Sequence, residues 1–174
     1  MTEMDARTNE MPIIAPAAPS LAAARYTLAF LFVLYALNYL DRQLLSILME
    51  PIREELHLSD TQLGILSGFA FALFYATLGI PIARLADRHS RRNIIAVAVA
   101  IWSVMTACCG FAQSFVTLLL PRIGVGIGEA GASPPAHSML SDYFPPKRRA
   151  AALAIYSAGI PVGILLGLAG GGWV

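Results

Sequence analysis

The stretch ARLADRHSRRNII, from Ala83 to Ile95, places four arginines and one aspartate between two long apolar segments. The flanking segments, Thr61–Ala83 and Ile94–Ser114, each exceed the roughly 20 residues that a helix needs to cross a hydrocarbon core. Such a segment must be helical, because lipid offers no hydrogen-bond partner to an unpaired backbone amide. This stretch therefore predicts a short charged loop that joins two membrane-spanning helices.

Long apolar segments extend over the rest of the chain as well. Only 13% of the 174 residues are charged, against about a quarter in a typical soluble domain, and the mean hydropathy is +0.65. The predicted fold class is an all-α membrane protein, in which short loops make consecutive helices antiparallel neighbours. The five predicted spans are Tyr26–Met49, Thr61–Ala83, Ile94–Ser114, Thr117–Leu140 and Ala150–Val174.

The basic residues are distributed unevenly between the two sides of these spans. Nine of the twelve lysines and arginines precede the first span, separate the second from the third, or separate the fourth from the fifth. The positive-inside rule places this side, with a flexible tail of residues 1–24, in the cytoplasm. The tail lacks the apolar core and cleavage site of a signal peptide. Alanine- and glycine-rich helices without eukaryotic sorting signals indicate a bacterial inner membrane.

Several function classes have no support in this sequence. A net charge of +1 without a basic face argues against nucleic acid as a partner. The three histidines are scattered, so no metal site is predicted, and no catalytic order of nucleophile, histidine and acid is present. The segment GIGEAG, Gly126 to Gly131, matches a dinucleotide fingerprint, but that motif needs a preceding strand. Inside an apolar span its glycines favour close helix packing, so no cofactor and no enzyme are expected.

The opening stretch also matches most of the pattern G-x-L-A-D-R-x-G-R-R, with Ala83 and Ser90 in place of its two glycines. The chain thereby resembles the major facilitator superfamily, which carries this signature between its second and third helices. The segments NYLDRQ (38–43), RIGVGIGEAGASP (122–134) and DYFPPKRRA (142–150) resemble its Spinster-like branch. The residues that match the loop signature are Leu85, Ala86, Asp87, Arg88, Arg91 and Arg92.

The resemblance implies a twelve-helix transporter of two six-helix bundles that works by alternating access. Its implied substrate is an organic anion or a lipid-like amphiphile, with proton coupling in some members. Because the chain ends at Val174, residues 25–174 are expected to form an incomplete N-terminal bundle. The implied partners are membrane lipid, a small-molecule substrate and the missing C-terminal half. The alternatives are a sugar or drug carrier of another branch, and a truncated membrane fragment that transports nothing.

The resemblance assigns a gating role to the charged loop. It implies that Asp87, Arg88, Arg91 and Arg92 latch the cytoplasmic side of the two halves in the outward-open state. The competing interpretation is that the arginines only fix the topology, since the positive-inside rule alone would select them there. That interpretation does not explain why an aspartate stands at position 87.

Four charged residues lie inside the predicted spans. Asp41 and Arg42 interrupt the first span, and Arg122 and Glu129 share one face of the fourth, because seven residues make two helical turns. Ionisable groups within a membrane are costly and tend to be functional. Since the resemblance places the first and fourth helices along one cavity, we expect a single neutral cluster. The alternatives are an ion pair that only locks the helices together, and a first helix that ends at Leu40.

The cluster suggests a mechanism. An arriving anion competes for an arginine, and the carboxylate that loses its partner tends to bind a proton. We therefore expect one of the two arginines to grip the anionic group of the substrate through two parallel hydrogen bonds. One of the two acids would carry the coupling proton. Asn38 and Tyr35, four and seven residues before Arg42, share its helix face and are predicted to line the same substrate pocket.

Glycine and proline predict the shape of the last two spans. Gly159, Gly163 and Gly167 repeat every four residues and form a small-residue ridge against a neighbouring helix. Pro161 is expected to bend the fifth span. The adjacent prolines 134–135 either kink the fourth span or mark its end.

Overall fold

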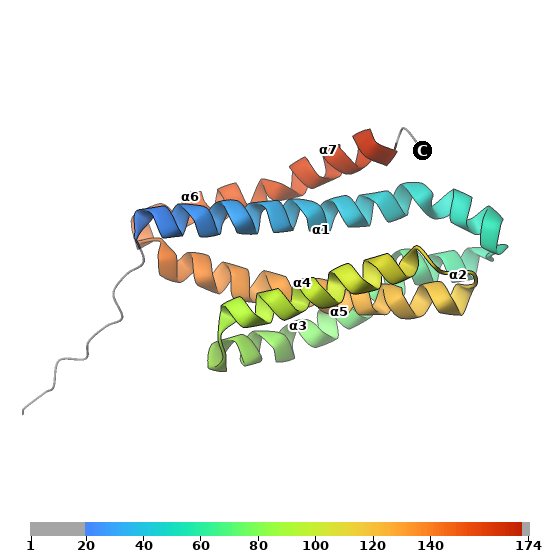
Figure 1. Ribbon diagram of the computed structural model, residues 1–174, viewed down its shortest axis with the longest axis horizontal. Coiled ribbons are helices and arrows are strands. Elements are labelled where there is room, and N and C mark those ends of the chain that lie inside the picture. Colours follow the sequence, from blue (N-terminus) through green and yellow to red (C-terminus); the bar gives the residue numbers. More distant parts are fainter. Residues whose placement is uncertain (1–19, 172–174) are drawn as a thin grey trace, which may run out of the picture.

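A computed structural model of the chain describes residues 20–171, without the side chains of Ala70, Phe71, Ala83 and Asp87. All regular elements in this part of the chain are helices (Figure 1). Within residues 20–171, five stretches are long and apolar enough to cross a membrane, as predicted. The elements are α1 (Leu21–Leu56), α2 (Asp60–Gly64), the π-helical η1 (Ile65–Phe69), α3 (Ala70–Arg88), α4 (Arg91–Cys109), α5 (Phe115–Tyr143), α6 (Pro146–Ser157) and α7 (Gly159–Gly171).

Helix α1 begins earlier than predicted. Ser20 caps it by accepting a hydrogen bond from the backbone N–H of Ala23 at 3.2 Å. The prediction of a flexible tail is therefore wrong for residues 21–24, where alanines favour helix and Ala24 is buried. Residues 1–19 of the predicted tail lie outside the described residues.

The C-terminal end of α1 also lies beyond the predicted end of the first span. The helix continues past Met49 and through Pro51 to Leu56, where His57 closes it in the left-handed conformation with φ of 51°. Ion pairs support this extension, because Arg53 lies 3.5 Å from Glu50 and 3.2 Å from Asp60.

Helix α4 ends at Cys109, five residues before the predicted end of the third span. The reason is that Ser114 caps α5 instead. The Ser114 hydroxyl accepts from the backbone N–H of Thr117, and the Thr117 hydroxyl accepts from the backbone N–H of Ser114. This reciprocal arrangement starts α5 two residues earlier than predicted.

The prolines act differently in the last two spans. Helix α5 runs through prolines 134–135 to Tyr143, so their interpretation as a helix end is wrong. Ala136 and Leu140, which follow them, pack in the main core cluster and hold this segment in place. The fifth span is broken at Ala158, between α6 and α7. Three residues later Pro161 lacks the N–H that a continuous helix needs, so the predicted bend is confirmed.

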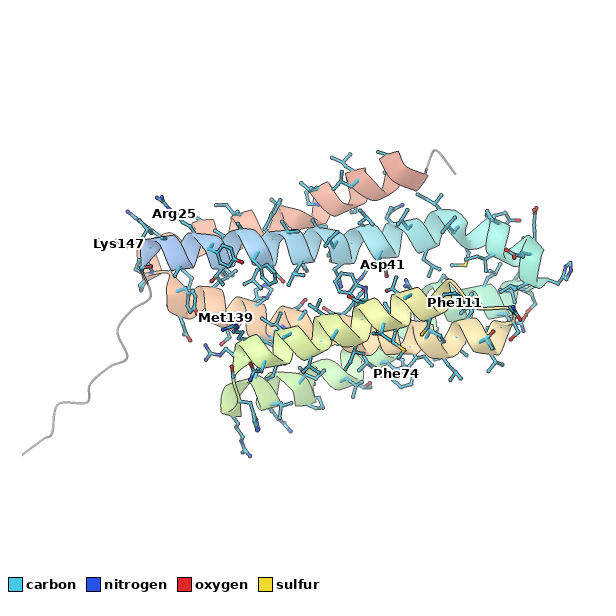
Figure 2. The ribbon with its side chains drawn as sticks, in the orientation of Figure 1. Arg25, Asp41, Phe74, Phe111, Met139 and Lys147 are labelled. Carbon is cyan, nitrogen blue, oxygen red and sulfur yellow. The ribbon has the colours of Figure 1, made fainter. Side chains whose placement is uncertain are left out.

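The helices form two groups (Figure 1). Helix α1 packs along α7 and α6, α5 packs along α4 and α3, and α1 meets α5 between the groups. We call the end of the bundle with Arg25 and Lys147 the basic end, and the end with Glu50 and Asp60 the acidic end. Figure 2 places Arg25 and Lys147 together, far from Phe111.

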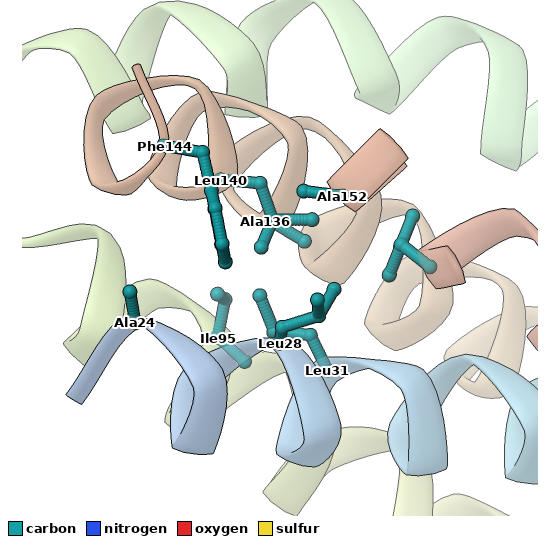
Figure 3. Packing of buried hydrophobic residues seen from close by; sticks show 9 residues of the cluster. Ala24, Leu28, Leu31, Ile95, Ala136, Leu140, Phe144 and Ala152 are labelled. Carbon is teal, nitrogen blue, oxygen red and sulfur yellow. The ribbon is translucent and has the colours of Figure 1, made fainter. Parts of the chain in front are cut away.

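The main core cluster lies at the basic end, where four helices converge (Figure 3). Leu28 and Leu31 of α1 pack there with Ile95 of α4 and Leu140 of α5, and Ala152 of α6 closes the cluster. This cluster fixes α1 against α5, the two helices that carry the intramembrane charges.

Glycines allow the closest helix contacts. A Cβ at Gly163 would collide with the carbonyl oxygen of Ala36 and lie 2.9 Å from Cβ of Tyr39. A Cβ at Gly128 would lie 2.7 Å from the backbone nitrogen of Trp102 on α4. The packing predicted for GIGEAG is therefore confirmed at Gly128. The predicted ridge of Gly159, Gly163 and Gly167 is buried against α1, and Gly171 extends it.

Candidate functional site

The four intramembrane charges form two ion pairs that join α1 to α5. Arg42 donates from Nε at 2.8 Å and from Nη2 at 2.7 Å to Oε2 of Glu129. Nη1 of Arg122 donates to Oδ2 of Asp41 at 3.2 Å. The predicted cluster is confirmed as an arrangement in space. A first helix that ends at Leu40 is excluded, because both charges lie within α1.

In each pair, the partner on α5 is more deeply buried than the partner on α1. The residues Glu129 and Arg122 are 1% and 6% exposed, whereas the side chains of Asp41 and Arg42 are 16% and 29% exposed. A buried charge costs several kcal/mol unless a partner offsets it. Both Arg42 bonds go to one oxygen of Glu129. The other oxygen, Oε1, is buried and has no hydrogen-bond partner within the described residues.

The unpartnered oxygen of Glu129 has a chemical consequence. A buried polar atom normally has a partner, so an exception at a charged site requires an explanation. A carboxylate that uses one oxygen for an arginine retains lone pairs on the other, where a proton can bind. Glu129 is therefore the better placed of the two acids to gain and lose a proton.

Aromatic rings surround the guanidinium of Arg42. It lies 5.1 Å from the ring centre of Tyr39 and 5.2 Å from that of Tyr75. Tyr39 packs edge-on to Tyr35 at 5.2 Å, and Tyr35 stacks on Tyr156 at 4.4 Å. A cation close to aromatic rings is stabilised by the negative faces of those rings.

Tyr35 and Asn38 lie one to two turns from Arg42 toward the basic end. Both line a small cavity between α1, α4, α5 and α6, but Arg42 is not among the residues that line it. The substrate pocket shared by all three stays a prediction, since Arg42 does not line this cavity. The reason is that the Arg42 side chain extends to Glu129 and Tyr75 instead.

A described side chain of the charged loop cross-links two helices. Arg91, at the start of α4, forms an ion pair with Asp142 near the end of α5. Arg88 and Arg92 are exposed. Asp87 lies in the last turn of α3, and its side chain is outside the described part of the structure.

Sequence reasoning missed four partners of the predicted residues. Only Tyr39 carried a signal, because it lies three residues before Arg42 on the same helix. The others are on different helices from the predicted residues that they contact, and they are Tyr75, Asp142 and Tyr156. Among residues 20–171, no group of three His, Cys, Asp or Glu side chains could hold a metal ion.

Comparison with known proteins gives consistent matches. The family model of the Major Facilitator Superfamily matches residues 31–174. An MFS-type efflux pump of Mycolicibacterium smegmatis is 46% identical over 136 residues, which are 78% of this chain and 32% of that protein. A hexuronate transporter of Bacillus subtilis is 35% identical over 134 residues, which are 77% of this chain and 32% of that protein.

A solved structure has the same fold. It is a bacterial homologue of the human lysosomal transporter Spinster in an inward-facing, unoccupied conformation. The TM-score is 0.85 at 50% sequence identity, covering 88% of this chain and 32% of that one. The chain thus spans about a third of the length of these relatives.

Proposed function

The chain belongs to the Major Facilitator Superfamily, and on that premise we propose that it is the N-terminal bundle of a secondary active transporter. The transporter moves an organic anion or a lipid-like amphiphile by alternating access and couples this movement to protons. The observation that carries the proposal is the pair of ion bridges between α1 and α5, with one oxygen of Glu129 unpartnered.

The proposed mechanism is an exchange of partners at Arg42. The anionic group of the substrate accepts the two hydrogen bonds that Arg42 now gives to Glu129. The Glu129 carboxylate, left buried without its cation, then takes up a proton, so anion and proton enter the site together. Arg122 and Asp41 supply a second cation and a second acid next to it. Arg42 suits the first contact because it is the more exposed arginine.

The anionic substrate class rests on charge and on relatives. Two arginines inside an apolar bundle favour a carboxylate or phosphate ligand. One relative is named for hexuronate, a sugar acid. The second candidate is a drug carrier, which the 46% identity to an efflux pump favours.

We also propose the placement of the bundle in its membrane. The basic end faces the cytoplasm of a bacterial cell, in accordance with the positive-inside rule. Arg91, through Asp142, ties α4 to α5 there, which fits a gate formed by the loop with Asp87, Arg88 and Arg92. Impermeant thiol reagents applied from each side to His57→Cys and His89→Cys variants lacking the two native cysteines test this. We expect the first site to react from outside and the second from inside.

Uptake into proteoliposomes tests the proposed transport. The full product of the gene, identified by immunoblot, is reconstituted and given labelled glucuronate or a labelled anionic lysolipid under an acid-outside gradient. We expect proton-driven uptake of one probe, abolished by Glu129→Gln and reduced by Asp41→Asn. The proposal is wrong if both variants accumulate the probe as the wild type does. It is equally wrong if the wild type transports neither probe, as a truncated fragment would behave.

A further inference from the structure

The guanidinium of Arg42 lies among side chains from three helices. It donates two hydrogen bonds to Oε2 of Glu129 on α5, at 2.8 Å from Nε and 2.7 Å from Nη2. Its Cζ atom also lies over the ring of Tyr39, one turn earlier on α1, at 5.1 Å from the ring centre. On α3, the ring centre of Tyr75 is 5.2 Å from the same atom. The cation is therefore held both by a carboxylate and by two aromatic rings.

The carboxylate and the rings respond differently to a proton. When Glu129 binds a proton, it loses its charge, and its hydrogen bonds with the guanidinium lose most of their strength. A neutral aromatic ring attracts a cation through its quadrupole, which does not depend on the protonation state of a neighbouring acid. The attraction of Tyr39 and Tyr75 for Arg42 thus persists at the step where that of Glu129 is lost.

This persistent attraction matters for binding, because a long side chain without a partner is free to move. Arginine has several rotatable bonds, and ordering them again for a ligand costs free energy. The other charged groups next to Arg42 are Asp41 and Arg122, which pair with each other at 3.2 Å. A guanidinium that stays over the two rings keeps its donors in place for the anion, so this ordering cost is not incurred during the exchange of partners.

The two rings come from different helices. Tyr39 precedes Arg42 by three residues on α1, so its ring lies on the same helix face as the cation. Tyr75 is on α3, which packs along α5, so its ring is carried by the same pair of helices as Glu129. Both tyrosines are half-buried, which favours a stronger cation–π attraction than at an exposed site. Removal of either ring is therefore expected to loosen Arg42.

We infer that Tyr39 and Tyr75 are positioning residues, whose rings hold Arg42 in place while its two hydrogen bonds pass from Glu129 to the substrate anion. This inference rests on the proposed function and deepens it by naming the groups that orient the anion-binding cation. The tyrosines act through their ring faces and neither gain nor lose a proton. They set the affinity for the anion, whereas the proton taken up with the anion depends on Glu129.

Binding measurements with graded ring chemistry test this inference. The full product of the gene is purified with leucine or phenylalanine at one position at a time, as Tyr39→Leu, Tyr75→Leu, Tyr39→Phe and Tyr75→Phe. Phenylalanine analogues with one, two or three ring fluorines are then introduced at the same positions. Fluorine weakens the negative face of the ring and nearly preserves its size, so it separates the quadrupole from packing.

Tyr143→Leu is the matched control. Tyr143 is also half-buried and packs against the main core cluster, but it lies fourteen residues beyond Glu129, about 21 Å along α5. This variant therefore loses a tyrosine ring of similar burial far from Arg42. Its affinity for the anion should match that of the wild type.

The measurements are equilibrium binding of labelled glucuronate and of the labelled lysolipid, and proton uptake per bound anion. We expect the leucine variants to bind the probe that the wild type recognises roughly 3- to 30-fold more weakly, the range of a cation–π contact. Affinity should stay near the wild-type value in Tyr39→Phe and Tyr75→Phe and fall stepwise with each added fluorine. Proton uptake per bound anion should equal that of the wild type throughout, since Glu129 is unchanged.

The outcomes separate this inference from the proposed function. If leucine weakens binding but the fluorinated rings bind as tightly as phenylalanine, the rings act by packing alone, and the inference is wrong while the proposed function stands. The same conclusion follows if the leucine variants bind the anion as tightly as the wild type. If the wild type binds neither probe, or binds one without taking up a proton, the proposed function fails and this inference fails with it.

Discussion

Arg42 has contacts that no other cationic side chain could reproduce. Its planar guanidinium donates two hydrogen bonds to Glu129 and lies near the rings of Tyr39 and Tyr75. A lysine ammonium would keep the charge but lose the fork of parallel donors and part of the contact with the rings. The site therefore depends on the shape of this cation as well as on its charge.

The substitution Arg42→Lys is expected to weaken anion binding by roughly 10- to 100-fold while the protein still folds. The reason is that one point charge replaces two parallel donors. The measurement is equilibrium binding of labelled glucuronate and of the labelled lysolipid to the purified full protein. Arg53→Lys is the control, because Arg53 belongs to a surface network with Glu50 and Asp60. If the Arg42→Lys variant and the wild type bind the anion with equal affinity, Arg42 does not hold the anion.

The charged members of the site could be predicted from the sequence because an ionisable group in an apolar span is rare and costly. The seven-residue spacing of Arg122 and Glu129 placed both on one face of their helix. The sequence could not identify Tyr75 or Tyr156, since neither has a spacing that relates it to Arg42 or Tyr35 on another helix. The choice of Glu129 over Asp41 as the proton carrier also needed the structure, because burial separates the two acids.

At the scale of helices, the contact between α1 and α7 depends on residues without side chains. Gly163 lies so close to Ala36 that a methyl group cannot fit, whereas Gly170 on the same helix has open space around its Cα. Because α1 carries Asp41 and Arg42, a displacement of α1 would move half of the ion-pair cluster. Helix packing at this contact thus positions the site.

The substitution Gly163→Ala is expected to destabilise the protein by roughly 1–3 kcal/mol, because the added methyl group overpacks the contact with α1. Gly170→Ala is the control, and it should be neutral or slightly stabilising because alanine favours helix over glycine. The measurement is the thermal unfolding midpoint of both variants in the same detergent. Equal midpoints would mean that α1 and α7 do not pack as described.

Helix ends were predicted less well than helix interiors for a physical reason. The apolar spans follow from hydropathy, but their ends depend on caps and on tertiary contacts. The cap at Ser20 lets α1 begin nearer the N-terminus than predicted. The cap at Ser114 starts α5 where the third span was expected to continue. The prolines at 134–135 stay within α5 because the helix beyond them is held in the core.

For the whole molecule, the fold class could be predicted because a membrane allows few backbone structures. The grouping of α1 with α7, and of α5 with α4 and α3, does not follow from hydropathy and needed the structure. The chain matches about a third of the length of its relatives. Transport by two facing bundles is therefore a property to be tested on the full product of the gene.

The central claim is that an anion and a proton bind together through Arg42 and Glu129. The most direct test is calorimetric titration of the full protein with glucuronate or the lysolipid, in buffers of different ionisation enthalpy, to count the protons taken up per anion bound. We expect about one proton per anion for the wild type and none for Glu129→Gln, since linkage requires the carboxylate to titrate. Anion binding by the wild type without proton uptake, or equal uptake by both proteins, would contradict the claim.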